Sequence, residues 1–144
     1  MMKASVRIPC QTKNLKEVRE ATRRFMQDLP ISAYEANLIL VAIDEICANA
    51  IIHANHSDPD RWLVVRLAYK NPFFQVEVEY QGAGFDYKNH QSRPVDEIKD
   101  SGRKGGLGLQ LVENIMDKVE FKFTRGKNVC LMNKNLLKPI NNNA

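Results

Sequence analysis

Hydrophobic and polar residues alternate along several stretches of the chain, and this period of two is the pattern of half-buried β-strands. The predicted strands are Ala4–Ile8, Trp62–Tyr69, Phe73–Tyr80, Val119–Thr124 and Val129–Met132. In the third of them, every second side chain from Phe74 to Tyr80 is apolar, and the residues between are glutamine or glutamate. Short turns at Lys70-Asn71-Pro72 and Arg125-Gly126-Lys127-Asn128 join the last four strands into two hairpins.

Helical spacing of apolar residues predicts three helices. The first begins after Thr12 or Asn14, either of which can cap it, and ends at Leu29-Pro30. The second begins with the capping-box sequence Ser32-Ala33-Tyr34-Glu35 and continues to about His53. The third follows a glycine cluster, and its expected inward-facing residues are Leu107, Leu111, Val112, Ile115 and Met116. Together these elements predict a two-layer α/β sandwich, in which helices cover one face of a mixed, mostly antiparallel sheet.

Two segments stand outside this pattern. Residues from Gln81 to Gly106 are polar and rich in charge and glycine, and a connection of that length is usually functional. The tail from Asn133 is mostly polar and is expected to fray. Because no repeat or linker divides the chain, we predict one domain over residues 1–144, with a polar tail over about 133–144.

The composition narrows the class of protein. Hydrophobic residues make up 44% and charged residues 26% of the chain, which is typical of a globular domain and excludes a disordered one. No stretch approaches about 18 uncharged apolar residues, and no apolar segment follows the first charges, so neither a membrane span nor a secretory signal is expected. The net charge of +4 permits an anionic ligand or an acidic partner and does not indicate nucleic-acid binding.

The cysteines indicate the redox state of the cellular compartment in which the protein works. Cys10, Cys47 and Cys130 are odd in number and far apart in the sequence. Their spacing matches neither a zinc site nor a disulfide framework. We therefore expect a reducing, cytoplasmic environment.

The second helix carries the most informative pattern of the chain. From Leu38 to Ile52 it is apolar on nearly every side, yet Glu45, Asn49 and His53 recur every four residues and form one polar stripe. Burying a carboxylate without a partner costs roughly several kcal/mol, so a buried stripe indicates a function. A partly exposed helix whose stripe faces water explains the pattern equally well at this point. The adjacent Asp44 is expected to face solvent.

Two glycine clusters add a second clue. Gly82-Ala83-Gly84 follows a predicted strand, and Gly105-Gly106-Leu107-Gly108 opens a predicted helix. Backbone N–H groups at the start of a helix bind anions, and glycine lets a phosphate approach the backbone. Glycines in both places also serve ordinary turn geometry. The first cluster is no dinucleotide-binding fingerprint, because Tyr87 stands where its third glycine would fall, and neither cluster is a P-loop.

Taken in order, these motifs resemble a known superfamily. The stripe ExxxNxxxH, the strand end GxGFD, the long polar loop and the helix start GGLGL resemble the N, G1 and G2 boxes of the GHKL, or Bergerat, histidine-kinase-like ATPase fold. Within it, the run Asp44-Glu45-Ile46-Cys47-Ala48-Asn49-Ala50-Ile51-Ile52-His53 is similar to that of bacterial anti-sigma-factor serine kinases. The helix sequence from Leu107 to Asp117 strengthens the resemblance, which covers most of the chain.

The resemblance implies roles for particular residues. Glu45 would be the catalytic general base toward a serine hydroxyl, and Asn49 would be the metal ligand that holds Mg²⁺ on ATP. Phe85–Lys104 would be a mobile lid. The other residues that the resemblance assigns to the nucleotide are His53, Tyr80, Gly82, Gly84, Arg103, Lys104, Gly106, Leu107 and Gly108. For Arg103 and Lys104, an ordinary solvated loop is an equally good interpretation.

Tyr80 departs from the pattern of the superfamily. The G1 box normally begins with an aspartate whose carboxylate accepts a hydrogen bond from the adenine amino group, and Tyr80 stands in its place. Losing such a bond typically costs ~1.5–3 kcal/mol, or about ten- to hundredfold in affinity. The tyrosine either weakens adenine recognition or fills the adenine slot. Glu79 or Gln81 could replace the carboxylate only if a bulge turned one of them around.

The resemblance implies an anti-sigma regulatory factor with serine/threonine protein kinase activity. Such proteins bind a sigma factor, use ATP and Mg²⁺ to phosphorylate a serine of an anti-anti-sigma (STAS-type) protein, and commonly work as homodimers, with no direct contact with nucleic acid or membrane. The alternative is a degenerate GHKL-fold protein-binding module that has lost nucleotide binding through Tyr80. The ATPase domain of a sensor histidine kinase is disfavoured, because no dimerisation-and-phosphoacceptor helix pair accompanies the predicted domain.

Overall fold

The computed structural model describes the backbone over residues 1–82 and 104–140, and side chains over 1–82 and 108–140. Its strands are β1 (Met2–Pro9), β2 (Trp62–Lys70), β3 (Phe73–Tyr80), β4 (Lys118–Thr124) and β5 (Lys127–Asn135). Its helices are α1 (Leu15–Met26), α2 (Ala33–Asn49) and α5 (Lys104–Ile115), with a 3₁₀ turn η1 (Thr12–Asn14) and a π-helical segment η2 (Ala50–Ala54).

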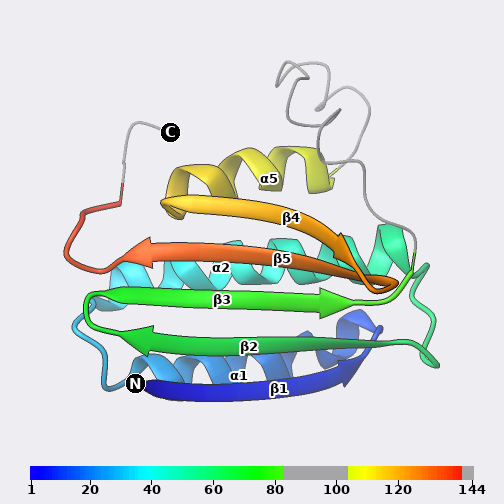
Figure 1. Cartoon of the computed structure of the whole chain (residues 1–144), viewed down its shortest axis with the longest axis horizontal. Coiled ribbons are helices and arrows are strands. Elements are labelled where there is room, and N and C mark those ends of the chain that lie inside the picture. Colours follow the sequence, from blue (N-terminus) through cyan, green and yellow to red (C-terminus); the bar gives the residue numbers. More distant parts are fainter. Residues whose placement is uncertain (83–103, 141–144) are drawn as a thin grey trace.

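The five strands form one sheet in the order β1-β2-β3-β5-β4, and each neighbouring pair is antiparallel. Figure 1 shows the helices α1, α2 and α5 behind this sheet, so the described part of the chain has two layers. The predicted α/β sandwich is confirmed, and no parallel pair occurs among the described strands. Arg125 and Gly126 join β4 to β5 with φ angles of +55° and +75°, which is the geometry of a tight hairpin turn.

The core lies between the sheet and α2. The predicted inward face of β3 is confirmed, because Phe74, Val76, Val78 and Tyr80 are all buried. By length and composition alone, the stretch Ala33–Ala54 could cross a membrane, with a mean hydropathy of 1.5. Half of it is buried inside the fold. Its place as the central core helix between α1 and α5 accounts for its apolar sequence.

The two predicted helix starts differ in outcome. Ser32 caps α2 as predicted, because its hydroxyl oxygen accepts a hydrogen bond from the Glu35 backbone N–H at 3.1 Å. Asn14, one of the two predicted capping residues, stands at the N-cap position of α1, but its side chain makes no capping hydrogen bond. The chain enters α1 through the 3₁₀ turn η1, and the Asn14 amide donates to the Glu17 carboxylate at 3.3 Å instead of accepting from the helix backbone.

Two further predictions are corrected. Leu111 is 38% exposed, and Leu109 is buried in its place, because the inward face of α5 follows Leu109, Val112 and Met116. The tail does not fray from Asn133, since β5 continues to Asn135 and Ile140 packs against the core. Residues 141–144 lie outside the described part of the chain.

A buried lysine explains why the tail is ordered. Lys134 is 1% exposed, and its amine donates to the carbonyl of Lys138 at 2.7 Å and to that of Asn135 at 3.2 Å. The Asp117 carboxylate lies 3.5 Å from the same amine. Because a buried ammonium needs partners, these contacts tie residues 135–138 back to the end of α5.

Candidate functional site

Glu45 lies where α2 packs against α5. A Cβ atom placed on Gly108 would be 1.9 Å from Cδ and 2.1 Å from Cγ of Glu45, so the half-buried carboxylate occupies the space that any other residue would fill. Gly108 therefore serves the site by admitting the Glu45 side chain, which sequence reasoning did not foresee. Its predicted role, presenting an N–H group to phosphate, stays a prediction.

The surroundings of Glu45 favour its protonated form. Burial raises the pKa of the Glu45 carboxyl above its usual range, and the negative charge of Asp44 raises it further. Asp44 was expected to face solvent, but it pairs with Arg19 of α1, with Nε–Oδ1 and Nη2–Oδ2 distances of 2.8 and 3.4 Å. A carboxylate with a raised pKa is a stronger base than an ordinary glutamate, which suits a general base.

Glu45 is reachable from outside through a groove between α1 and α2. The groove has a volume of about 380 Å³ and is lined by Arg19, Arg23, Asn37, Leu40, Val41, Asp44 and Glu45. The groove carries two arginines and two carboxyl groups, and Arg19 is paired with Asp44, so its lining suits a polar segment of another molecule.

Asn49 lies one helical turn beyond Glu45 and is 2% exposed. Its Nδ2 atom is buried and has no hydrogen-bond partner within the described residues. A buried polar atom without a partner costs about 1–3 kcal/mol, so Asn49 is a candidate for binding a ligand. Rotation of the amide by 180° brings its oxygen to the same place, and an amide oxygen is a ligand that Mg²⁺ accepts.

The predicted stripe ends at Asn49. From Ala50 to Ala54 the helix continues as the π-helical segment η2, which changes the direction of the residues that follow. His53 consequently lies exposed, outside the buried part of the stripe. Single π-helical turns inside helices are frequent at functional sites. The segment η2 therefore fits a site at the end of α2.

The exit of β3 forms the other end of the site. Tyr80 is 2% exposed and belongs to the core, so its ring fills space between the sheet and the helices. Two residues later, Gly82 has a φ of +93°, and a Cβ there would lie 2.4 Å from the Ala54 carbonyl oxygen. Only glycine permits this close approach of strand exit and helix end.

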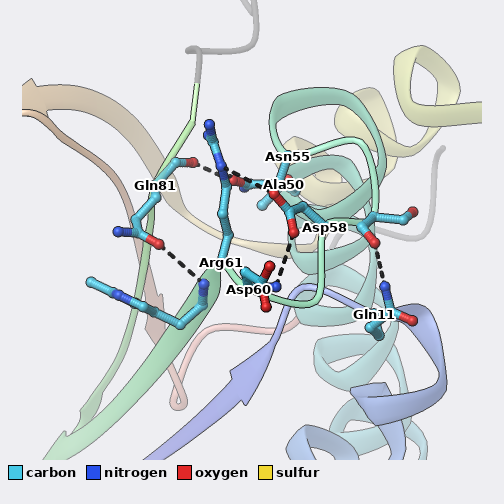
Figure 2. A network of polar contacts seen from close by, with 9 residues as sticks. Gln11, Ala50, Asn55, Asp58, Asp60, Arg61 and Gln81 are labelled. Atoms are coloured by element: carbon cyan, nitrogen blue, oxygen red, sulfur yellow. Dashed lines mark hydrogen bonds and ion pairs between the residues drawn. The ribbon is translucent and has the colours of Figure 1, made fainter.

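Sequence analysis missed the residue that ties these elements together. Asn55 is 2% exposed, and its Nδ2 donates to the carbonyls of Ala50 and Gln81, each at 2.9 Å. Its Oδ1 accepts from Arg61 at 3.4 Å. Figure 2 shows this network, in which the end of α2 is joined to the exit of β3. An asparagine directly after a long apolar helix was the available signal in the sequence.

A second buried asparagine, Asn128, holds the same turn from β5. It is 5% exposed, and its Nδ2 donates to the Gly82 carbonyl at 2.9 Å. The exit of β3 is therefore fixed from two sides, by Asn55 and by Asn128, immediately before the predicted lid.

Several predicted residues lie outside what the structure describes. Gly84, Arg103 and nearly all of the predicted lid fall within 83–103, and the side chains of Lys104 and Leu107 are likewise not described. Gly106 lies in the first turn of α5, where its backbone N–H is available to an anion. Among the described residues, the predicted site members that meet are Glu45 and Gly108 at one end, and Tyr80 and Gly82 at the other.

Comparison with known proteins gives a family and a fold. The histidine kinase-like ATPase domain family matches residues 8–134. A protein named anti-sigma F factor from Oceanobacillus iheyensis is 24% identical over 102 residues, which are 71% of this chain and 70% of that protein. The serine-protein kinase RsbW of Bacillus subtilis is 25% identical over 134 residues, 88% of this chain and 81% of that protein. The RsbU and RsbW domains of a Mycobacterium tuberculosis protein share the fold, with a TM-score of 0.67 at 15% identity over 94% of this chain and 33% of that one.

Proposed function

The chain belongs to the histidine kinase-like ATPase domain family, and from that premise we propose that it is an anti-sigma regulatory factor with serine-protein kinase activity. It binds a sigma factor and phosphorylates a serine of an anti-anti-sigma protein of the STAS type, as a homodimer in a bacterial cytoplasm. The names of its relatives support this function. The observation that carries it is the half-buried Glu45 carboxylate one turn from Asn49, whose buried Nδ2 has no hydrogen-bond partner within residues 1–82 and 104–140.

Each residue then has a task in phosphoryl transfer. Bound ATP supplies the phosphoryl group, and Mg²⁺ offsets the negative charge that develops on it. Glu45 accepts the proton of the attacking serine hydroxyl, and burial keeps its affinity for that proton high. Asn49 would hold Mg²⁺ through its amide oxygen. Within residues 1–82 and 104–140, no cluster of three or more acidic, histidine or cysteine side chains could hold a metal ion by itself.

Two further parts of the structure, the start of α5 and the groove between α1 and α2, would bind the phosphates and the protein substrate. Gly106 lies in the first turn of α5, whose backbone N–H groups have no partner within the helix, so this end of α5 would bind the phosphates. The serine-bearing segment reaches Glu45 through the groove lined by Arg19 and Arg23.

Phosphorylation of an anti-anti-sigma protein from the same bacterium tests this proposal. The protein is incubated with radiolabelled ATP and Mg²⁺, and phosphoserine is identified on the partner. Glu45→Gln lowers transfer about a hundredfold or more, whereas the matched control Asp44→Asn, which removes the neighbouring carboxylate, retains it. Binding of the partner without any transfer by the unmodified protein contradicts the kinase.

One observation favours a second function, a protein-binding module without nucleotide. Tyr80 lies in the core, where the superfamily places the carboxylate that reads adenine. If the ring excludes the base, the protein binds its partners and binds no ATP. A calorimetric titration with ATP distinguishes the two functions.

A further inference from the structure

The side of α2 that faces away from the sheet carries an apolar seam. In the helical layer α2 lies between α1 and α5 (Figure 1), so this side forms the middle of the layer's outer surface. The residues of the seam follow one another at steps of four and three: Tyr34, Leu38, Val41, Glu45, Ala48 and Ile52. Tyr34, Val41 and Ile52 are 64%, 45% and 44% exposed, and the other three are half-buried. The central core helix therefore also presents apolar side chains to solvent.

The spacing of the seam indicates what kind of structure fits it. Alternating steps of four and three residues are the a and d positions of a heptad repeat, which pack against the side chains of another α-helix. Side chains of a strand or an extended loop repeat every two residues and do not match this spacing. Contiguous exposed apolar surface marks interaction sites, unlike single scattered residues. The seam thus fits an amphipathic helix of another protein.

The two neighbouring helices border the seam with different chemistry. On the α5 side, Leu111 is 38% exposed and follows Gly108, which packs against Glu45, by three residues. On the α1 side, the wall of the groove carries Arg19 and Arg23. Arg19 is paired with a carboxylate of α2, whereas Arg23 has no ion pair within the described part of the chain. A docked helix would meet an apolar edge on one side and a positive charge on the other.

We propose that the seam docks an amphipathic helix of the protein substrate, with an acidic residue of that helix beside Arg23 and a serine opposite Glu45. This inference rests on the proposed kinase function and specifies how its substrate is recognised. Glu45 is the only carboxyl group of the seam, and one polar residue in an otherwise apolar heptad seam sets the register of the partner helix. An apolar side chain opposite Glu45 would leave the half-buried carboxyl without a partner, whereas a serine hydroxyl donates a hydrogen bond to it. The register that satisfies Glu45 therefore brings the serine to the base.

Site-specific photo-crosslinking to the anti-anti-sigma protein of the same bacterium tests this geometry. The photoreactive residue p-benzoylphenylalanine replaces Tyr34, Val41 or Ile52 in turn, and mass spectrometry identifies the residues that it captures. All three sites should capture residues of one partner helix, at heptad intervals along it. The control site is Phe73, which is 55% exposed on the sheet face away from the helices and should capture nothing. Capture of loops or strands, capture of a second copy of this chain, or equal capture from Phe73 overturns the proposal.

Affinities for the same partner, measured by calorimetry without ATP, test the seam and its charged border with matched pairs of variants. Val41→Asp should weaken binding about tenfold or more, whereas Phe73→Asp should change it by less than about twofold. Arg23→Glu should weaken binding about tenfold. Arg24→Glu makes the same charge change on the next residue, which does not line the groove, and should have less than about a third of that effect. Equal losses within each pair overturn the proposal.

The docking surface and the kinase can fail separately in these experiments. Capture along one partner helix by a protein that transfers no phosphate supports the docking surface and refutes the kinase. Phosphoryl transfer to a partner that is captured only from sites outside the seam overturns the docking surface and leaves the kinase in place.

Discussion

At the α2–α5 end of the site, defined by Glu45, Asn49 and Gly108, a half-buried carboxylate lies one helical turn from a buried amide nitrogen that has no partner among the described residues. At the β3-exit end, defined by Tyr80, Gly82, Asn55 and Asn128, an aromatic ring is in the core and two asparagines hold the turn through hydrogen bonds at 2.9 Å. The α2–α5 end lowers the free energy of unfolding, because Asn49 Nδ2 has no partner within the described residues. The second end mostly stabilises the fold.

The two ends of the site therefore have different expected roles, the α2–α5 end in phosphoryl transfer and the β3-exit end in recognition of the base. The groups that would move a proton and hold a metal include a buried amide nitrogen without a partner among the described residues, whereas the region that would read the base contains a packed ring. Substitutions at the β3-exit end should therefore act on stability first. Substitutions at the α2–α5 end should act on phosphoryl transfer first.

The largest effect is expected at the β3-exit end. Tyr80→Asp removes a buried ring and places a charge in the core, so it should lower the free energy of unfolding by about 3–5 kcal/mol. Denaturant unfolding measures this loss. Tyr80→Phe, which keeps the ring, is the control, and a Tyr80→Asp variant as stable as the parent would show that the ring borders a solvated pocket.

Glu45→Gln should separate activity from stability at the other end. Loss of the general base lowers phosphotransfer about a hundredfold or more, equivalent to roughly 2.7 kcal/mol in the barrier. The fold is not weakened at neutral pH, because a group whose pKa is raised by burial destabilises the fold once it ionises.

The direction of the Glu45 pKa shift determines how the stability difference between the parent and Glu45→Gln changes with pH. The Glu45 pKa is raised in the folded protein, so stability of the parent relative to Glu45→Gln improves as pH falls through that pKa. Parent activity should rise with pH over the same range, as the base loses its proton. Thermal melting and initial rates across pH 4 to 8 measure both, and a variant that is less stable at every pH would contradict a catalytic role.

Gly108→Ala should disturb the same carboxylate indirectly. The new Cβ would lie 1.9 Å from Glu45 Cδ, so the flexible side chain must move away. Helix propensity improves by about 1 kcal/mol, which offsets the strain, and stability changes little. Transfer should fall about tenfold. Adding Gly108→Ala to Glu45→Gln should cost nothing further, and independent losses would show that Gly108 acts elsewhere.

The smallest effect concerns the ion pair between α1 and α2. Arg19 and Asp44 are 40% and 33% exposed, so Arg19→Met should change stability by less than about 1 kcal/mol. It leaves the charge of Asp44 beside Glu45 without its partner, which should shift the pH–rate profile to higher pH. Asp44→Asn should shift the profile to lower pH, and unchanged profiles in both variants would show that Asp44 does not influence Glu45.

Local patterns predicted much of the fold because each depended on near neighbours. The Ser32 cap, the alternation along β3 and the turn after β4 all follow from a few adjacent residues. The prediction that the tail frays from Asn133 was wrong, because the burial of Lys134 depends in part on Asp117, which is distant in the sequence. Leu111 was placed inward because helical spacing allows two neighbouring choices, and packing against α2 decides between them.

The residues of the site show the same distinction between local signals and contacts that are distant in the sequence. Glu45 and Asn49 were visible because a four-residue spacing on an apolar helix is a local signal. Asn55 and Asn128 were not, because one acts through a π-helical segment and the other through the pairing of β3 with β5. A cross-strand partner such as that of Tyr80 can be read only once the register is known.

Calorimetric titration of the chain with ATP, in the presence and absence of Mg²⁺, tests the central claim most directly. The account predicts that ATP binds, that Mg²⁺ tightens the binding, and that Asn49→Ala removes most of the Mg²⁺ effect. The variant should keep or gain stability, because the buried Nδ2 of Asn49 has no described partner. No binding of ATP at millimolar concentration by the folded protein would contradict the account and leave a protein-binding module.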